Sequence, residues 1–158
     1  AFMASSGDKQ RPLAGAIPAS KPPSDAGAMG SDADSDAKFV LVVEDDEKTL
    51  RLLGMVLQRG GFRVALAPNG VTAVNLLKRT IPDLIVLDLR MPKMDGFQLL
   101  NLLNKYQSSS MIPVIVLTGS SNPFDIDRAL SLGISDYLVK PISPRKLLGK
   151  VQDLLGSI

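Results

Sequence analysis

The stretch LIVLDLRMPKMDG, residues 84–96, opens with four consecutive apolar residues that are followed at once by Asp88. A continuous apolar run of this length is typical of a strand buried on both faces, as the strands of parallel sheets are. Ligands of open parallel sheets bind at the carboxyl ends of the strands. Asp88 therefore stands where a functional side chain is expected.

Four more apolar runs occur along the chain, at 39–43, 62–65, 114–117 and 137–139. Between and after the runs, apolar residues recur at helical spacing and are expected to face the sheet: Leu50, Leu53 and Leu57; Val71, Val74 and Leu77; Phe97, Leu100 and Leu103; Ile126, Ala129 and Leu130; Leu147, Val151 and Leu154. This alternation predicts a doubly wound α/β fold, in which five parallel strands are joined by right-handed crossovers and covered by five helices.

The first 37 residues differ in kind from the rest, because 23 of them are Ala, Ser, Pro or Gly. Such a segment buries too little apolar surface to offset the entropy of ordering it. We therefore predict a disordered tail at 1–37 and a folded domain at 38–158. The tail could have no task of its own, or it could act as a tether or partner-binding arm.

The composition excludes several kinds of chemistry. The chain has no Cys and no His, so thiol nucleophiles, disulfides and imidazole ligands are absent. A net charge of +2 gives no reason to expect nucleic-acid binding. No apolar run approaches the roughly 18 residues of a membrane span, and the N-terminus lacks the apolar core of a signal peptide. The expected location is the cytoplasm, without membrane attachment.

Polar side chains follow four of the five predicted strands. Glu44 and Asp45 follow the first, Asp88 the third, Thr118 the fourth and Lys140 the fifth. Carboxylates gathered at one edge of a sheet repel one another, and a hard divalent cation such as Mg²⁺ relieves the repulsion. The two acids after Asp45 are instead expected at a solvated helix N-terminus.

A carboxylate at this edge can act as a nucleophile and form an acyl phosphate. Phosphoryl transfer then depends on positioning and on cations. Lys140 supplies one positive charge, a bound metal supplies another, and the Thr118 hydroxyl can donate to a phosphoryl oxygen. Taken singly, Lys140 could be a surface lysine and Thr118 a strand-end cap.

At these residues, the region 38–158 resembles the receiver domains of two-component response regulators. Four motifs carry the resemblance in order: VLVVEDD at 40–46, DLRMPKMDG at 88–96, IVLTG at 115–119 and YLVKPI at 137–142. Each motif alone is weak, but the four together at the family's spacing are specific. The resemblance implies a flavodoxin-like sheet with strand order 2-1-3-4-5.

The resemblance also implies residue roles. Asp88 matches the phosphoacceptor. Asp45 matches a direct Mg²⁺ ligand, Glu44 a ligand acting through water, and Arg90 the residue whose backbone carbonyl binds the metal; Mn²⁺ is an alternative ion. Thr118 and Lys140 match the switch hydroxyl and the family's lysine.

Other matches concern conformation rather than chemistry. Tyr137 matches the aromatic residue whose rotamer follows phosphorylation. Pro92 and Gly96 match a structural loop, and the bond before Pro141 is usually cis in this family.

Three residues depart from the commonest pattern: Glu44 replaces Asp, Gly119 replaces Ala, and Arg90 places a long cation beside the site. Arg90 could obstruct the attacking water or pair with a nearby acid, and we expect a long-lived phosphoryl group. Gly119, which has no side chain, is expected to let its loop move easily and so to loosen the coupling of the switch.

The expected donor is a histidine kinase or a histidine phosphotransfer protein, and the response is expected on the face built from residues 121–155. Such a domain acts only on itself and is a signalling switch rather than a turnover enzyme. Three readings stay open: a single-domain phosphate relay or sink, the receiver of a longer transcriptional or enzymatic regulator, and a phosphorylation-independent binding module. A phosphatase of the dehalogenase type would need an acid where Arg90 stands.

Overall fold

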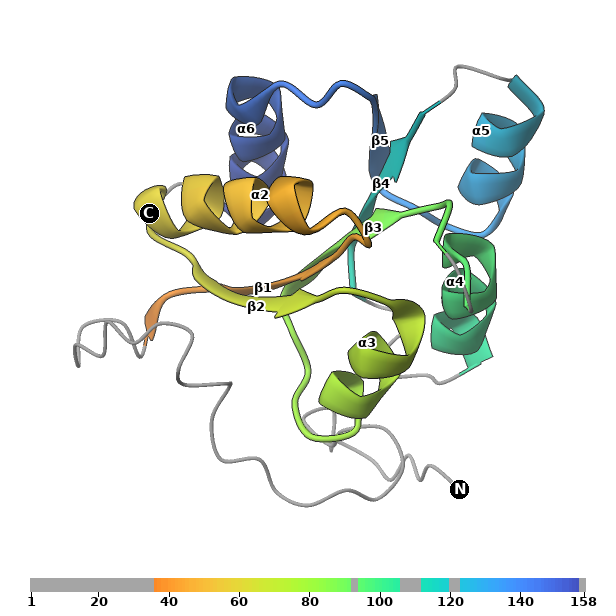
Figure 1. Cartoon of the computed structure of the whole chain (residues 1–158), viewed down its shortest axis with the longest axis horizontal. Helices are drawn as coiled ribbons and strands as arrows, with labels where there is room; N and C mark the ends of the chain where they lie inside the picture. Colours follow the sequence, from red (N-terminus) through yellow and green to blue (C-terminus); the bar gives the residue numbers. More distant parts are fainter. Residues whose placement is uncertain (1–35, 92–93, 106–111, 120–122, 157–158) are drawn as a thin grey trace.

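The computed structural model describes residues 36–91, 94–105, 112–119 and 123–156 of the chain (Figure 1). The predicted tail therefore lies outside the described residues, apart from 36–37, as does Pro92. Within this part of the chain the strands are β1 (Phe39–Val43), β2 (Arg63–Ala67), β3 (Leu84–Asp88), β4 (Val114–Thr118) and β5 (Asp136–Val139). The helices, labelled as in Figure 1, are α2 (Glu47–Arg59), α3 (Gly70–Leu77), α4 (Gly96–Lys105), α5 (Pro123–Ser131) and α6 (Pro144–Leu155).

The five strands form one parallel sheet in the order β2-β1-β3-β4-β5. The predicted doubly wound α/β fold and its strand order are thus confirmed. The second strand was predicted at 62–65, but it runs from Arg63 to Ala67 because it pairs with β1 along its whole length. Phe62 instead closes the turn after α2, where its N–H donates to the Leu57 carbonyl.

Helices cover both faces of the sheet and create two apolar cores. Helices α2 and α6 pack on one face, and α3, α4 and α5 lie on the other (Figure 1). Alternate residues of β1 serve the two cores: Leu41 and Val43 point into one, and Val40 and Val42 into the other. Burial on both faces explains why the central strands are continuous apolar runs.

The start of α2 accounts for two of the four acids that follow β1. Asp46 is the N-cap, and its carboxylate accepts a hydrogen bond from the Thr49 N–H at 3.0 Å. Glu47 lies in the first turn, where a negative charge interacts favourably with the helix dipole. Both residues therefore serve the helix start, as predicted. The helix ends before Gly61, whose φ of 98° places it in the left-handed region.

Three of the predicted apolar stripes are partly wrong. In α3, Val71 is 47% exposed, whereas Leu77 is buried as predicted, and Ala73 and Leu76 face the core beside it. Five of the eight residues of α3 are apolar, so the spacing of apolar residues does not define a single face of this helix. In α5 and α6, Leu130 and Leu154 were expected to face the sheet but are exposed. The other buried members of these stripes, Ala129, Leu147 and Val151, agree with the prediction. Over the described residues, none of the helices has the length and apolar character needed to cross a membrane.

Candidate functional site

Asp88 is the last residue of β3 and is 1% exposed. Its Oδ1 accepts a hydrogen bond from the backbone N–H of Arg90 at 3.1 Å. Gly96 lies next to the end of β3, where its N–H donates to the Leu89 carbonyl at 2.9 Å. A Cβ on Gly96 would lie 2.6 Å from the Asp88 carbonyl oxygen, so this close approach requires glycine.

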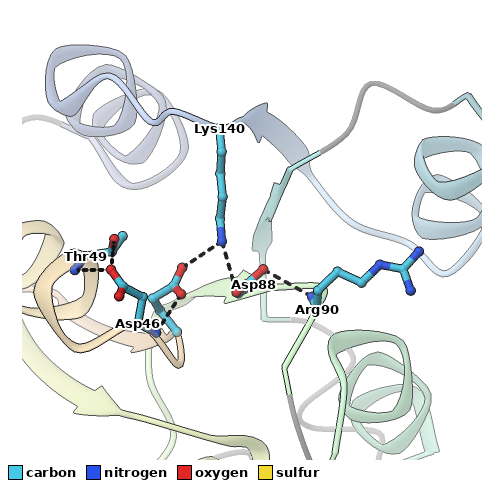
Figure 2. Close-up of polar contacts among 6 residues, drawn as sticks. Asp46, Thr49, Asp88, Arg90 and Lys140 are labelled. Atoms are coloured by element: carbon cyan, nitrogen blue, oxygen red, sulfur yellow. Dashed lines mark hydrogen bonds and ion pairs between the residues drawn. The ribbon is translucent and has the colours of Figure 1, made fainter.

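Lys140 brings a positive charge to Asp88 from the end of β5. Its backbone N–H donates to the Thr118 carbonyl at 2.7 Å, which ties the ends of β4 and β5 together. Its side chain then extends to the carboxylates, and Nζ lies 3.1 Å from Asp88 Oδ2 (Figure 2). The same Nζ lies 3.3 Å from Oε1 of Glu44. One ammonium group is therefore shared by two buried carboxylates.

Glu44 follows β1 and is fully buried, whereas Asp45 next to it is exposed. Oε2 of Glu44 accepts a hydrogen bond from the Asp46 N–H at 2.9 Å. Oε1 forms the ion pair with Lys140, but within the described part of the chain it accepts no hydrogen bond of good geometry. A buried carboxylate oxygen in this state retains capacity for a further ligand.

Burial changes how these groups titrate. Loss of solvent, with a smaller contribution from the nearby Asp88 carboxylate, raises the pKa of Glu44 to about 7 against the opposing effects of the Asp46 N–H and Lys140. Burial also raises the pKa of Asp88, although the Arg90 N–H and Lys140 oppose the shift. Desolvation works to lower the pKa of Lys140, but the two carboxylates outweigh it and raise that pKa. Burial is thus the main reason why both carboxyl groups hold their protons more strongly than usual.

The three carboxylates fit a hard divalent cation. Glu44, Asp45 and Asp88 each offer an oxygen, and these oxygens lie within 4.8 Å of one another. All are the hard ligands that Mg²⁺ prefers, and the unsatisfied Oε1 of Glu44 belongs to the same group. A cation here would stabilise the charged forms of the buried carboxylates, whose pKa values burial raises.

The other predicted site residues lie around this cluster. Thr118 ends β4 and is 2% exposed. Tyr137 is half-buried on β5 and packs against the core beneath α3, α4 and α5. The peptide bond between Lys140 and Pro141 is cis. At Gly119 an added Cβ would meet none of the described residues within 4 Å.

Arg90 points away from the carboxylates. Figure 2 shows its backbone next to Asp88 and its side chain pointing away from both Asp88 and Lys140. The guanidinium donates to Asp125 Oδ2 at 2.9 Å. Of the two possibilities considered for Arg90, pairing with a nearby acid is therefore the one that the structure shows. Asp125 lies in the first turn of α5, 35 residues further along the chain, and sequence reasoning did not single it out.

The family sequence model for the response regulator receiver domain matches residues 40–152. The chain belongs to this family. The resemblance inferred from the four motifs is thus confirmed, and the chain carries a receiver domain of the kind that two-component response regulators use for phosphorylation-activated signalling. Members of the family are signalling switches rather than enzymes of metabolism.

The chain is also similar to individual proteins of known sequence. The chain is 39% identical over 118 residues to the alkaline phosphatase synthesis transcriptional regulatory protein PhoP of Bacillus subtilis, covering 75% of this chain and 48% of PhoP. It is 41% identical over 113 residues to an uncharacterized 14.6 kDa protein of Leptolyngbya boryana, covering 72% of this chain and 86% of that protein. The chain thus spans about half the length of PhoP but most of the smaller relative.

A solved receiver domain has the same fold. It belongs to the sensor histidine kinase PA1611 of Pseudomonas aeruginosa PAO1, with 30% identity, a TM-score of 0.70, and coverage of 77% of this chain and 99% of that one. That structure has a magnesium ion coordinated in its active site cleft.

Proposed function

We propose that Asp88 is the residue of this receiver domain that accepts the phosphoryl group. The observation that carries the proposal is the position of its carboxylate, buried at the end of β3, 3.1 Å from the Lys140 ammonium and among two further carboxylates. A nucleophile, a fixed cation and a set of hard oxygen ligands are what phosphoryl transfer to a carboxylate needs.

The donor is a phosphohistidine carried by a histidine kinase or a histidine phosphotransfer protein. An oxygen of Asp88 attacks the phosphorus in line, the phosphorus–nitrogen bond breaks, and its electron pair returns to the imidazole of the donor. Lys140 stabilises the charge that spreads over the phosphoryl oxygens, and the Thr118 hydroxyl donates to one of them. Later attack by water regenerates the Asp88 carboxylate and releases inorganic phosphate, using the same residues.

Mg²⁺ is the proposed cofactor, with Mn²⁺ as an alternative that accepts the same oxygen ligands. Asp45, Asp88 and the Arg90 backbone carbonyl would hold it directly, and Glu44 would act through water. When bound, the ion neutralises phosphoryl and carboxylate charge during the transfer. The magnesium in the Pseudomonas receiver domain and the unsatisfied oxygen of Glu44 support this assignment.

The phosphoryl group would change the surface built from residues 121–155. Thr118 would move toward the phosphoryl oxygens, and Tyr137 would turn inward into the space that the movement opens. A partner, or an output domain like those that accompany receivers in the longer relatives, would then respond to the altered surface.

Labelling with acetyl phosphate tests the phosphoacceptor. The full chain is expected to take up phosphate in Mg²⁺, and Asp88→Ala is expected to take up none. Asp153→Ala, which removes an exposed carboxylate of α6, is the matched control and should label like the original chain. Label that survives Asp88→Ala would refute the assignment.

A further inference from the structure

Arg90 makes two contacts that connect the phosphoacceptor to a helix. Its backbone N–H donates to Asp88 Oδ1 at 3.1 Å, and its guanidinium donates to Asp125 Oδ2 at 2.9 Å. The Arg90 side chain is 68% exposed, so in the described part of the chain it is held by the Asp125 carboxylate rather than by packing. Asp125 is only 17% exposed and belongs to the first turn of α5.

After phosphorylation, a phosphoryl group on Asp88 would attract the Arg90 guanidinium more strongly than Asp125 does. Because the Arg90 backbone adjoins Asp88, its long side chain can turn back toward that residue once it leaves Asp125. A phosphoryl group at neutral pH carries about two negative charges and three acceptor oxygens, whereas Asp125 carries one charge. Arginine is also well suited to pair with phosphate through two N–H groups.

We propose that Asp125 is a positioning residue that controls where Arg90 points. Before phosphorylation it holds the guanidinium away from Glu44, Asp45 and Asp88, so that the charge of Arg90 does not compete with a metal. After phosphorylation the guanidinium exchanges Asp125 for the phosphoryl group and shields it from attacking water. The inference rests on the proposed function of Asp88.

The exchange would also loosen one end of α5. Of the residues of this helix, only Ala129 is buried, so its attachment depends on other contacts. Two of these lie toward its C-terminal end: the Arg128 guanidinium sits 4.0 Å from the Phe97 ring centroid, and Asn104 donates to the Leu132 carbonyl at 2.8 Å. Departure of Arg90 from Asp125 weakens the opposite end, within the face proposed to respond.

The test compares Asp125→Asn with Asp127→Asn, which removes the same charge from an exposed position of the same helix. Each purified chain is labelled with acetyl phosphate, and loss of label is followed after removal of the donor. Asp125→Asn should lengthen the lifetime about two- to fivefold, the range that an ion pair with one exposed partner contributes to an equilibrium. Asp127→Asn should leave it unchanged, and Asp125→Glu should restore most of the original value.

A double-variant comparison separates positioning from a structural effect on α5. Arg90→Gln should shorten the lifetime, and adding Asp125→Asn to it should change nothing further. Without phosphate, Asp125→Asn should weaken Mg²⁺ binding in calorimetric titration, and it should not do so when Arg90 is already Gln. Equal lifetimes for Asp125→Asn and the original chain, or the same change with and without Arg90, would overturn the inference alone. A chain that takes no label on Asp88 would overturn the proposed function as well.

Discussion

The ammonium of Lys140 lies 3.1 Å from the carboxylate of Asp88, although 52 residues separate the two in the chain. Their meeting follows from the fold, because β3 and β5 flank β4 and all three end at the same edge of the sheet. The two partners differ in their access to solvent, since Asp88 is buried and the Lys140 side chain is 32% exposed. Removal of the lysine therefore leaves the buried partner without its cation.

Lys140→Met should lower the free energy of unfolding by about 1–3 kcal/mol at pH 8, the usual cost of removing one partner from a buried charged hydrogen bond. The loss should be smaller at pH 5, because a larger share of Asp88 and Glu44 is then protonated. Urea denaturation at the two pH values measures both effects. Lys146→Met, on the exposed side of α6, should change stability by less than about 0.5 kcal/mol. Equal losses for both variants would show that the pair contributes nothing.

Stability without metal should fall as pH rises from about 4.5 to about 7. The pKa of Glu44 rises from 4.5 to about 7 on folding, so the folded protein keeps a proton that the unfolded chain releases in this window. The free energy of unfolding therefore decreases with pH, by up to about 3 kcal/mol. Burial also raises the pKa of Asp88, so this residue should likewise make the free energy of unfolding decrease as pH rises.

Glu44→Gln should flatten this pH dependence, because the amide has no proton to release. Glu47→Gln, at the exposed start of α2, should leave the slope as it is. Denaturation midpoints in urea across the pH range, with a chelator present, provide the measurement. A slope that is unchanged in Glu44→Gln would mean that another group causes it.

Gly96→Ala should destabilise the protein by about 1–3 kcal/mol, the cost of forcing an extra carbon into a packed site. Its Cβ would lie 2.6 Å from the Asp88 carbonyl oxygen and 2.7 Å from the Leu89 Cα, and backbone atoms cannot move away cheaply. Gly149→Ala in α6 is the matched control, because its Cβ would meet no atom of the described part of the chain within 4 Å. That control should gain about 0.5–1 kcal/mol from the higher helix propensity of alanine. Thermal unfolding of the two variants should therefore shift in opposite directions.

The apolar runs and the residues that follow them were sufficient to predict the sheet and the strand ends that supply its polar side chains. Each of these polar residues directly follows one apolar run: Asp45, Asp88, Thr118 and Lys140. Because parallel strands all end at the same edge of a sheet, the sequence was enough to predict that these residues lie at one site. The contact between Arg90 and Asp125 could not be predicted in this way. One residue lies in a loop and the other on a helix, and only the packing of α5 determines that they meet.

Helix faces were predicted less well where apolar residues crowd together. In α3, five apolar residues among eight are compatible with more than one face, and the structure buries the face with Ala73 and Leu77. Leu77→Ala should thus cost about 2–5 kcal/mol in the free energy of unfolding, because it opens a cavity in the core. Val71→Ala, on the exposed side of the same helix, should cost less than about 0.5 kcal/mol. If the two costs were reversed in urea denaturation, the assignment of the buried face would be wrong.

Asp45→Asn should separate metal binding from folding. Asp45 is exposed, so the substitution should change the stability of the metal-free protein by less than about 0.5 kcal/mol. A ligand that binds only the folded state stabilises it by about 2.7 kcal/mol at a concentration of 100 times its Kd, and the original chain should gain this amount from Mg²⁺. Asp45→Asn should lose most of the gain, because the variant lacks a negatively charged oxygen ligand. Asp46→Asn is the control, since asparagine also caps helices well and Asp46 is not among the three clustered carboxylates. Thermal unfolding with increasing Mg²⁺ should therefore move the midpoint of Asp46→Asn as in the original chain, and an equal movement in Asp45→Asn would place the metal elsewhere.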